Sequence, residues 1–409
     1  MKKDKKKIII ITITIIIAGI LGITIYENNK IIEDNTSYRI KQKEIEVYSN
    51  IKISDLIELL DGKINDNKVI DTKTTGEKEI TFFYHKKDKR TRKGTFTIQI
   101  KDTEEPLVWL SNSYSVKVGS KIDLASTILC ADNYDKKPEC KIEGDYDLNK
   151  AGNYRLTYVA TDNSNNTQKV DFTLYVYEPK KTTTKTTTAT NTAFKDVLTN
   201  YKSDNTSIGI DVSKWQEEID FKKVKAAGAE FVMIRVGAQK GVEGEYILDS
   251  YFKKNIENAT KEGLKVGIYF YSYANSEEEA QKQAKWVIKQ IKKYNISLPV
   301  AFDWECYQSF NEMELSLFGL NQVANAFLDT IKQHGYEAML YGSKNYLKAI
   351  WKYQSANIWL AHYTKQTDYD ADYVMWQLCQ DGKIDGIKTD VDIDILYQKE
   401  KVEKKKTSK

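Results

Sequence analysis

Two carboxylates separated by one residue, Asp303 and Glu305, are the best-placed residues of this sequence for performing chemistry. They end an apolar run, 298–302, that has the length of a buried strand. Side chains two positions apart on a strand point to the same face, with Cα atoms roughly 6.5–7 Å apart. In such a pair, burial and the neighbouring charge raise one pKa, so one group stays protonated while the other is ionised. This division of roles is what hydrolysis of a glycosidic bond requires.

The D-x-E pattern also occurs wherever two carboxylates are merely solvated, so the elements around it decide its meaning. Asp211 ends another short apolar run, and Arg235 ends a third. Asp392 and Asp394 lie within a fourth run near the end of the chain. If these runs are parallel strands of one sheet, their carboxyl ends meet, and three or four carboxylates converge on one mouth.

The segment 207–397 alternates strand-length apolar runs with helical stretches, which predicts parallel strands joined by helices. Helices are expected between the first six strands, and short loops between the last three. This pattern predicts an α/β TIM-like barrel of the (β/α)5(β)3 type, smaller than the roughly 250 residues of an ordinary barrel. The expected strands are 208–211, 231–235, 266–271, 300–305, 338–341, 358–361, 374–378 and 391–396.

Residues 8–26 form an uncharged apolar run of about the length that crosses a bilayer as a helix. The five Lys of residues 1–7 predict a short cytoplasmic tail before it. We therefore expect a single-pass protein of the cell membrane that contacts the lipid bilayer through 8–26 and has its catalytic domain outside, in the cell wall. A cleaved signal peptide is the alternative, but the run is longer than usual for one.

An internal repeat occupies the segment after this run. At an offset of 76 positions, Gly76 aligns with Gly152 and Phe96 with Phe172, and both copies alternate apolar and polar residues. The repeat predicts two all-β sandwiches, 38–105 and 106–179, and the second copy resembles bacterial immunoglobulin-like modules. Cys130 and Cys140 form either a disulfide or two free thiols. A Thr-rich linker, 180–206, and a basic tail, 398–409, complete the expected domains.

Composition excludes several functions. The first seven residues alone account for the formal net charge of +4, so no broad basic surface for nucleic acid is expected. The chain has three His and four Cys, with neither a CxxC nor an HExxH pattern, so zinc chemistry and catalysis by Cys or His are not expected. We predict no metal and no cofactor.

The segment 207–397 resembles glycoside hydrolase family 25, the lysozymes of the Chalaropsis type. The resemblance is carried by motifs in the family's order and spacing: Gly209-Ile-Asp211-Val-Ser213, Phe231-Val-Met-Ile-Arg235, Gly267-Ile-Tyr269, Phe302-Asp303-Trp-Glu305, Trp376-Gln377 and Val391-Asp392-Ile-Asp394. It implies an N-acetylmuramidase that cuts the β-1,4 bond between N-acetylmuramic acid and N-acetylglucosamine in peptidoglycan glycan strands. A wall-spanning secretion or conjugation machinery is among the partners that such an enzyme could serve.

The resemblance also implies roles for four carboxylates. Glu305 would be the general acid and later the base, and Asp303 would orient the substrate acetamido group, with direct nucleophilic attack as its alternative role. Asp211 and Asp392 match the family's other two acidic positions. The family usually has Asn where this chain has Asp394, so the chain departs from the family pattern on the eighth strand.

Substrate contacts are expected from side chains near the strand ends, where aromatic rings could stack on sugars or simply pack in the barrel. Arg235 could instead pair with a carboxylate. A wall-binding or adhesion protein without catalysis is the alternative function, and a chitinase-like hydrolase is disfavoured because the longer acidic run of that family is missing. The expected contact residues are Tyr269, Tyr271, Tyr341, Trp376, Gln377 and Arg235.

Overall fold

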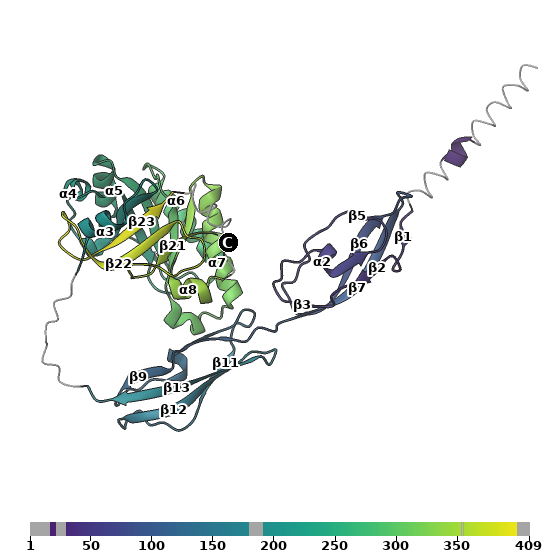
Figure 1. Ribbon diagram of the computed structural model, residues 1–409, viewed down its shortest axis with the longest axis horizontal. Helices are drawn as coiled ribbons and strands as arrows, with labels where there is room; N and C mark the ends of the chain where they lie inside the picture. Colours follow the sequence, from purple (N-terminus) through teal and green to yellow (C-terminus); the bar gives the residue numbers. More distant parts are fainter. Residues whose placement is uncertain (1–16, 22–29, 180–190, 353, 355, 399–409) are drawn as a thin grey trace, which may run out of the picture. The chain divides into compact units, whose positions relative to one another are not determined.

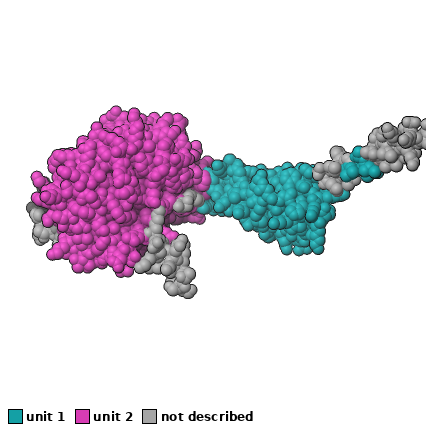
Figure 2. All heavy atoms as spheres, turned by 90° about the horizontal axis from the view of Figure 1, so that it is seen from above, with its two compact units in different colours: residues 1–104 teal, residues 105–409 magenta. Residues whose placement is uncertain are grey.

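The computed structural model describes residues 17–21, 30–179, 191–352, 354 and 356–398. They divide into two compact units, residues 1–104 and 105–409, which have different colours in Figure 2. The first unit contains one β module, and the second contains another β module and a barrel (Figure 1).

The β module of the first unit is built on a long antiparallel hairpin, β6 (Gly76–His85) and β7 (Thr91–Lys101). Alternate hairpin residues such as Ile80, Phe82 and Phe96 are buried, as period-two alternation predicts. The sheet order is β1-β7-β6-β5, with β3 also on β7, and β2 pairs separately with β4. The other elements are β1 (Ile32–Glu33), β2 (Tyr38–Ile40), β3 (Glu44–Glu46), α2 (Ile53–Leu56), β4 (Ile57–Leu59) and β5 (Lys63–Ile64).

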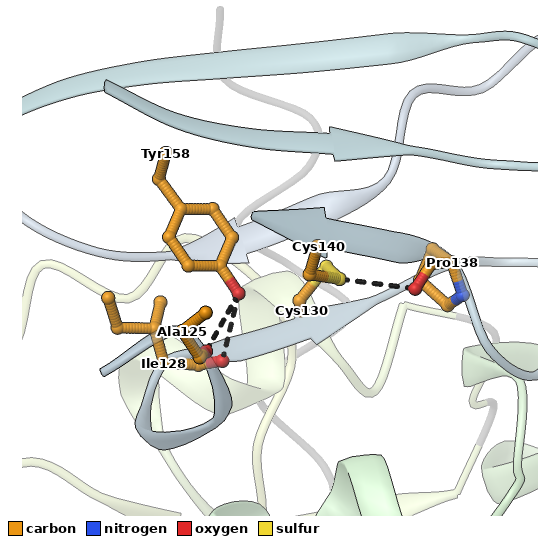
Figure 3. Close-up of a disulfide and its surroundings, with 6 residues drawn as sticks. All are labelled: Ala125, Ile128, Cys130, Pro138, Cys140 and Tyr158. Carbon is orange, nitrogen blue, oxygen red and sulfur yellow. Dashed lines mark hydrogen bonds between the residues drawn. A yellow bond between two sulfur atoms is a disulfide. The ribbon is translucent and has the colours of Figure 1, made fainter. Parts of the chain in front are cut away.

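The β module of the second unit repeats this hairpin 76 positions later, as β12 (Gly152–Thr161) and β13 (Thr167–Tyr177). Its main sheet has the order β11-β12-β13-β9, and β8 and β10 form a separate pair. Cys130 of β10 and Cys140 of β11 form a disulfide that joins the two sheets, so the bridged alternative is correct (Figure 3). The short elements are β8 (Leu107–Trp109), β9 (Ser113–Lys117), η1 (Ala125–Thr127), β10 (Leu129–Ala131) and β11 (Glu139–Glu143).

The predicted fold class, in which a transmembrane helix and two immunoglobulin-like sandwiches precede the barrel, is wrong. An immunoglobulin-like sandwich packs two antiparallel sheets face to face. Here each module has one larger sheet with a parallel edge, because β1 and β3 pair parallel with β7, and β9 pairs parallel with β13. The alternation of apolar residues identifies strands with a buried face, but it contains no information about the direction of the neighbouring strand.

The structure also contradicts the predicted transmembrane helix and the single-pass localisation based on it. In the described ranges, no helix combines the length and the apolar character needed to cross a membrane. Of the predicted span 8–26, residues 17–21 form a short helical segment, and the rest lies outside the described residues.

Eight strands of the second unit form one closed barrel sheet. Neighbours from β15 to β22 pair in parallel, and β23 closes the sheet by pairing antiparallel with both β22 and β15. Each strand lies at a position expected from the sequence. The barrel strands are β15 (Thr206–Val212), β16 (Phe231–Gln239), β18 (Lys265–Ser272), β19 (Val300–Trp304), β20 (Ala338–Ser343), β21 (Asn357–Ala361), β22 (Met375–Lys383) and β23 (Val391–Tyr397).

Helices connect the first six barrel strands, while β21, β22 and β23 follow one another without a helix between them. The longer helices have polar N-caps: the Ser276 hydroxyl accepts from Glu279 N before α6, and the Ser316 hydroxyl accepts from Gly319 N before α7. The helices are α4 (Phe221–Ala226), α5 (Phe252–Lys261), α6 (Glu277–Ile291), α7 (Leu317–Gln333) and α8 (Lys344–Ala349); additional elements are β14 (Thr192–Ala193), α3 (Phe194–Tyr201), η2 (Lys214–Gln216), β17 (Tyr246–Leu248) and η3 (Tyr307–Glu312).

The barrel has two apolar layers. A small inner cluster fills the barrel below the mouth and includes Met233, Ala301, Met339 and Trp359. A larger outer cluster lies between the strands and the helices. Because successive strand residues alternate between these layers, the inner cluster supports the inward-facing residues at the strand ends.

Candidate active site

The carboxyl ends of the barrel strands surround a cavity of about 290 Å³. Asp211 comes from β15, Asp303 from β19, and Glu305 follows β19 directly. Asp392 of β23 completes the acidic lining. The structure therefore brings all four predicted carboxylates together, because the closed sheet places the ends of distant chain segments around one opening.

Most of the predicted contact residues line the same cavity, namely Tyr269, Tyr271, Tyr341, Gln377 and Arg235. Gln377 organises part of the lining: its Nε2 donates to Asp211 Oδ2 at 2.8 Å. Its Oε1 accepts from the hydroxyl groups of Tyr341 and Tyr363, each at 3.0 Å.

Trp376 lies elsewhere, between β22 and α3. Its Nε1 donates to the backbone oxygen of His362 at 2.8 Å, and its ring packs edge-on against Tyr201. Its two neighbours on β22 point inward: Met375 is part of the inner cluster, and Gln377 lines the cavity. A residue between two inward-facing residues of a strand must point outward.

Arg235 is the cationic side chain of the cavity lining, and it pairs with Asp249. Its Nε and Nη2 lie 2.9 Å and 2.8 Å from Asp249 Oδ2, in a pair whose side chains are 14% and 1% exposed. Asp249 also accepts backbone N–H groups from Lys214 and Tyr251. The expectation of a carboxylate partner is confirmed, and the guanidinium is thereby held at the rim.

The electrostatics of the cavity favour neutral carboxyl groups. Burial, and then the neighbouring Asp394, raise the pKa of Asp211 well above its usual value. Burial, and then the charge of Glu305, do the same to the pKa of Asp303. Burial raises the pKa of Asp392 to about 8, with a further contribution from Asp211. Burial and mutual repulsion therefore disfavour ionising all of these carboxyl groups together. Asp392 is largely protonated at neutral pH, and a protonated carboxyl group can donate as well as accept.

Asp394 is a fifth carboxyl group of this cluster, placed deeper than the others. It is fully buried, and its Oδ1 accepts from Trp359 Nε1 at 2.8 Å. Burial, and then Asp392, raise the pKa of Asp394. Two oxygens of the cluster, Asp303 Oδ1 and Asp394 Oδ2, are buried without a hydrogen-bond partner among the described residues.

Sequence reasoning missed six residues of the cavity lining: Ser213, Trp215, Gln216, Trp359, Tyr363 and Gln380. Trp215 is 67% exposed, and its sequence signal was an aromatic residue two positions after the first strand motif. Tyr363 lines this cavity and two neighbours of about 740 Å³ and 940 Å³. The cavity of about 740 Å³ also shares Tyr271, Glu305 and Tyr341 with the carboxylate cavity, so the two form one cleft. No sequence motif marks Tyr363.

Comparison with known proteins identifies the class of the barrel. Residues 210–387 match the family model described as "Glycosyl hydrolases family 25". This segment is somewhat less than half of the chain, and the predicted resemblance to the family is confirmed for it.

Individual relatives match over the same part of the chain. The autolytic lysozyme of Clostridium acetobutylicum is 28% identical over 189 residues, which cover 46% of this chain and 54% of that protein. Lysozyme M1 of Streptomyces globisporus is 26% identical over 203 residues, which cover 45% of this chain and 65% of that protein. The chain thus spans between half and two thirds of the length of these curated relatives.

Among solved structures, a family 25 glycosyl hydrolase from Bacillus anthracis has 22% sequence identity and a TM-score of 0.42. The similarity covers 49% of this chain and 94% of that one.

Proposed function

We propose that this protein is a peptidoglycan hydrolase of the lysozyme type, an N-acetylmuramidase. The observation that carries the proposal is the pairing of Asp303 and Glu305 in a cavity that shares Glu305 with a larger neighbouring cavity of about 740 Å³. A cleft of this form has room for a chain substrate that extends beyond the cleaved bond. The family match of residues 210–387 supports the same substrate class.

In the proposed reaction, Glu305 protonates the glycosidic oxygen of the β-1,4 bond that joins the anomeric carbon of N-acetylmuramic acid to the following N-acetylglucosamine. The acetamido oxygen of the same sugar attacks its anomeric carbon, and the bond to the leaving N-acetylglucosamine breaks. In its ionised form Asp303, buried and adjacent to Glu305, accepts a hydrogen bond from the acetamido N–H and stabilises the positive charge of the cyclic intermediate. Glu305 then takes a proton from water, which opens the ring and restores the original configuration.

The remaining carboxyl groups are proposed to hold the substrate. Asp211 is fixed by Gln377, and Asp392 lies on the neighbouring strand, paired across from it. With raised pKa values, these groups present hydroxyl donors to sugar oxygens and add little negative charge beside Asp303. Local gaps opened in the wall would serve growth, separation, or a wall-spanning secretion or conjugation machinery.

The test compares the full chain with Glu305→Gln on purified peptidoglycan. A matched control is Glu257→Gln, which makes the same change on the exposed side of α5. We expect new reducing ends on N-acetylmuramic acid from the unchanged chain and from the control, identified by mass spectrometry. Glu305→Gln should lose at least about 100-fold in rate, because it cannot protonate the leaving oxygen.

Other products separate the alternatives. Reducing ends on N-acetylglucosamine would indicate a glucosaminidase. Binding without cleavage by a folded chain would favour a wall-binding protein, and full activity of Glu305→Gln would disprove the acid assignment.

A further inference from the structure

A line of stacked aromatic rings leads from the β module of the second unit to the catalytic strand. Trp109 of β8 stacks on Tyr346 of α8, with ring centroids 4.9 Å apart and planes inclined by 25°. Tyr346 stacks in turn on Tyr307, at 3.5 Å and 11°. Tyr307 meets Trp304 edge-on at 5.2 Å, and Trp304 lies between Asp303 and Glu305 in the chain.

The same β module holds the loop that leaves the catalytic strand. Leu317 N donates to Asp132 O at 2.7 Å, and Phe318 N donates to Asn133 O at 3.2 Å. These donors belong to the first turn of α7, where a helix has no internal acceptors. The module therefore fixes the end of the segment 305–316, which begins at Glu305.

Strand β10 belongs to two cores at once. Leu129 and Ala131 are buried in the core of the barrel, while Cys130 between them is buried in the core of the module. The Cys130–Cys140 disulfide ties this strand to the main sheet of the module. The contact is thus an apolar one, shared by both folds, rather than a meeting of polar surfaces.

The aromatic line also forms a wall of the cleft. Tyr307 and Tyr346 line the cavity of about 740 Å³, together with Glu305, Tyr271 and Tyr341. Trp109 packs behind Tyr346 without belonging to that lining. The cavity is large enough for sugar units on one side of the cleaved bond, and aromatic rings suit the apolar faces of sugars.

We propose that Trp109 is a positioning residue: through Tyr346 and Tyr307, the β module shapes the part of the cleft that binds the glycan beyond the cleaved bond. The inference rests on the proposed function for the identity of the glycan. It assigns the module a role in recognising long glycan strands, because short fragments need not reach this wall.

The test is a binding measurement that does not require cleavage. Long uncrosslinked peptidoglycan strands and a tetrasaccharide of the same alternating sugars are titrated into Glu305→Gln and into the Glu305→Gln/Trp109→Leu double variant. We expect Trp109→Leu to weaken binding of the long strands by about threefold to tenfold, since a lost aromatic stack has that magnitude. Binding of the tetrasaccharide should change by less than about twofold.

Steady-state kinetics of the chain with Glu305 unchanged provide a second test. Trp109→Leu should raise KM for long strands by a similar factor and leave kcat within about twofold, while Trp109→Phe, which keeps a ring, should restore KM. Tyr175→Leu is the matched control, because Tyr175 is a 41% exposed aromatic residue of β13 in the same module. If Trp109→Leu does not fold, Trp109→Met replaces it, as a long side chain without a ring.

The outcomes separate the two proposals. Unchanged binding and KM for long strands in a folded Trp109 variant would overturn the role of the module, whatever the chain hydrolyses. Equal weakening for the tetrasaccharide and the long strands would overturn it too, since it would indicate a general structural effect. If the unchanged chain binds peptidoglycan strands and does not cleave them, the hydrolase proposal fails. The comparison of long strands with the tetrasaccharide still tests the proposed role of Trp109 in that case.

Discussion

The floor of the cleft and its rim contain the same acidic side chain in opposite settings. At the rim, Asp249 is buried with a guanidinium and two backbone N–H groups as partners. At the floor, Asp303 is equally buried, faces Glu305, and has an oxygen without a hydrogen-bond partner in the described structure. Its partners make the rim carboxylate structural, while burial and the charge of Glu305 raise the pKa of the floor carboxyl and suit it to chemistry.

The largest expected effect is that of Asp303→Asn on activity. We expect the rate of peptidoglycan hydrolysis to fall by at least about 100-fold, because the amide cannot stabilise positive charge. Its melting temperature should stay the same or rise, since the change removes a carboxyl group that is costly to bury. Hydrolysis rates and thermal unfolding measured on one preparation would test this. A clear loss of stability would contradict the proposed difference between Asp303 at the floor and Asp249 at the rim.

Asp249→Asn should show the reverse pattern. It leaves Arg235 without its charge partner. The free energy of unfolding should therefore fall by an amount near the lower end of the roughly 3–5 kcal/mol typical of broken buried pairs, because the guanidinium is 14% exposed. Hydrolysis by the folded protein should fall by less than about tenfold. Asp329→Asn is the control, because its pair with Lys332 is exposed and should contribute less than about 1 kcal/mol. Equal stability of both variants, measured by denaturant unfolding, would contradict the comparison.

Asp392→Asn tests how the carboxyl groups at the floor of the cleft make the stability of the protein depend on pH. Because folding raises the pKa of Asp392 from 3.8 to about 8, its contribution to stability is complete below about pH 4 and is lost as the pH rises to about 8. The variant should therefore lose less stability than the unchanged chain between pH 4 and pH 8. Melting temperatures across this range measure the difference, and parallel curves would show that Asp392 is ionised in the fold.

The smallest effect is expected from Asp394→Asn. A protonated carboxyl group and an amide have nearly the same shape, and the amide oxygen can still accept from Trp359 Nε1. The rate of hydrolysis should stay within about threefold. Asp394→Ala removes the acceptor and should be less stable, because it leaves the indole N–H unpaired. A loss above 100-fold in the Asn variant would mean that Asp394 acts as an anion.

Strand positions and the acidic cluster were predictable because both depend on local chemistry. Apolar runs located the eight barrel strands, and a carboxylate at the end of a parallel strand must lie at the mouth. Trp376 lies outside the cavity lining. The prediction placed it in the lining by motif, while its outward direction follows from its inward-facing neighbours Met375 and Gln377. Tyr363 could not be found, since loops have no period that reveals the direction of a side chain.

By itself, the sequence determined the elements and the chemical identity of the cleft, because apolar period and residue type are properties of short segments. The tertiary structure alone decided which strands pair in parallel in the β modules, which carboxylate has a guanidinium partner, and where a β module meets the barrel. These are contacts between residues far apart in the chain. Their free energy comes from burial and desolvation at the place where distant segments meet, which local sequence does not encode.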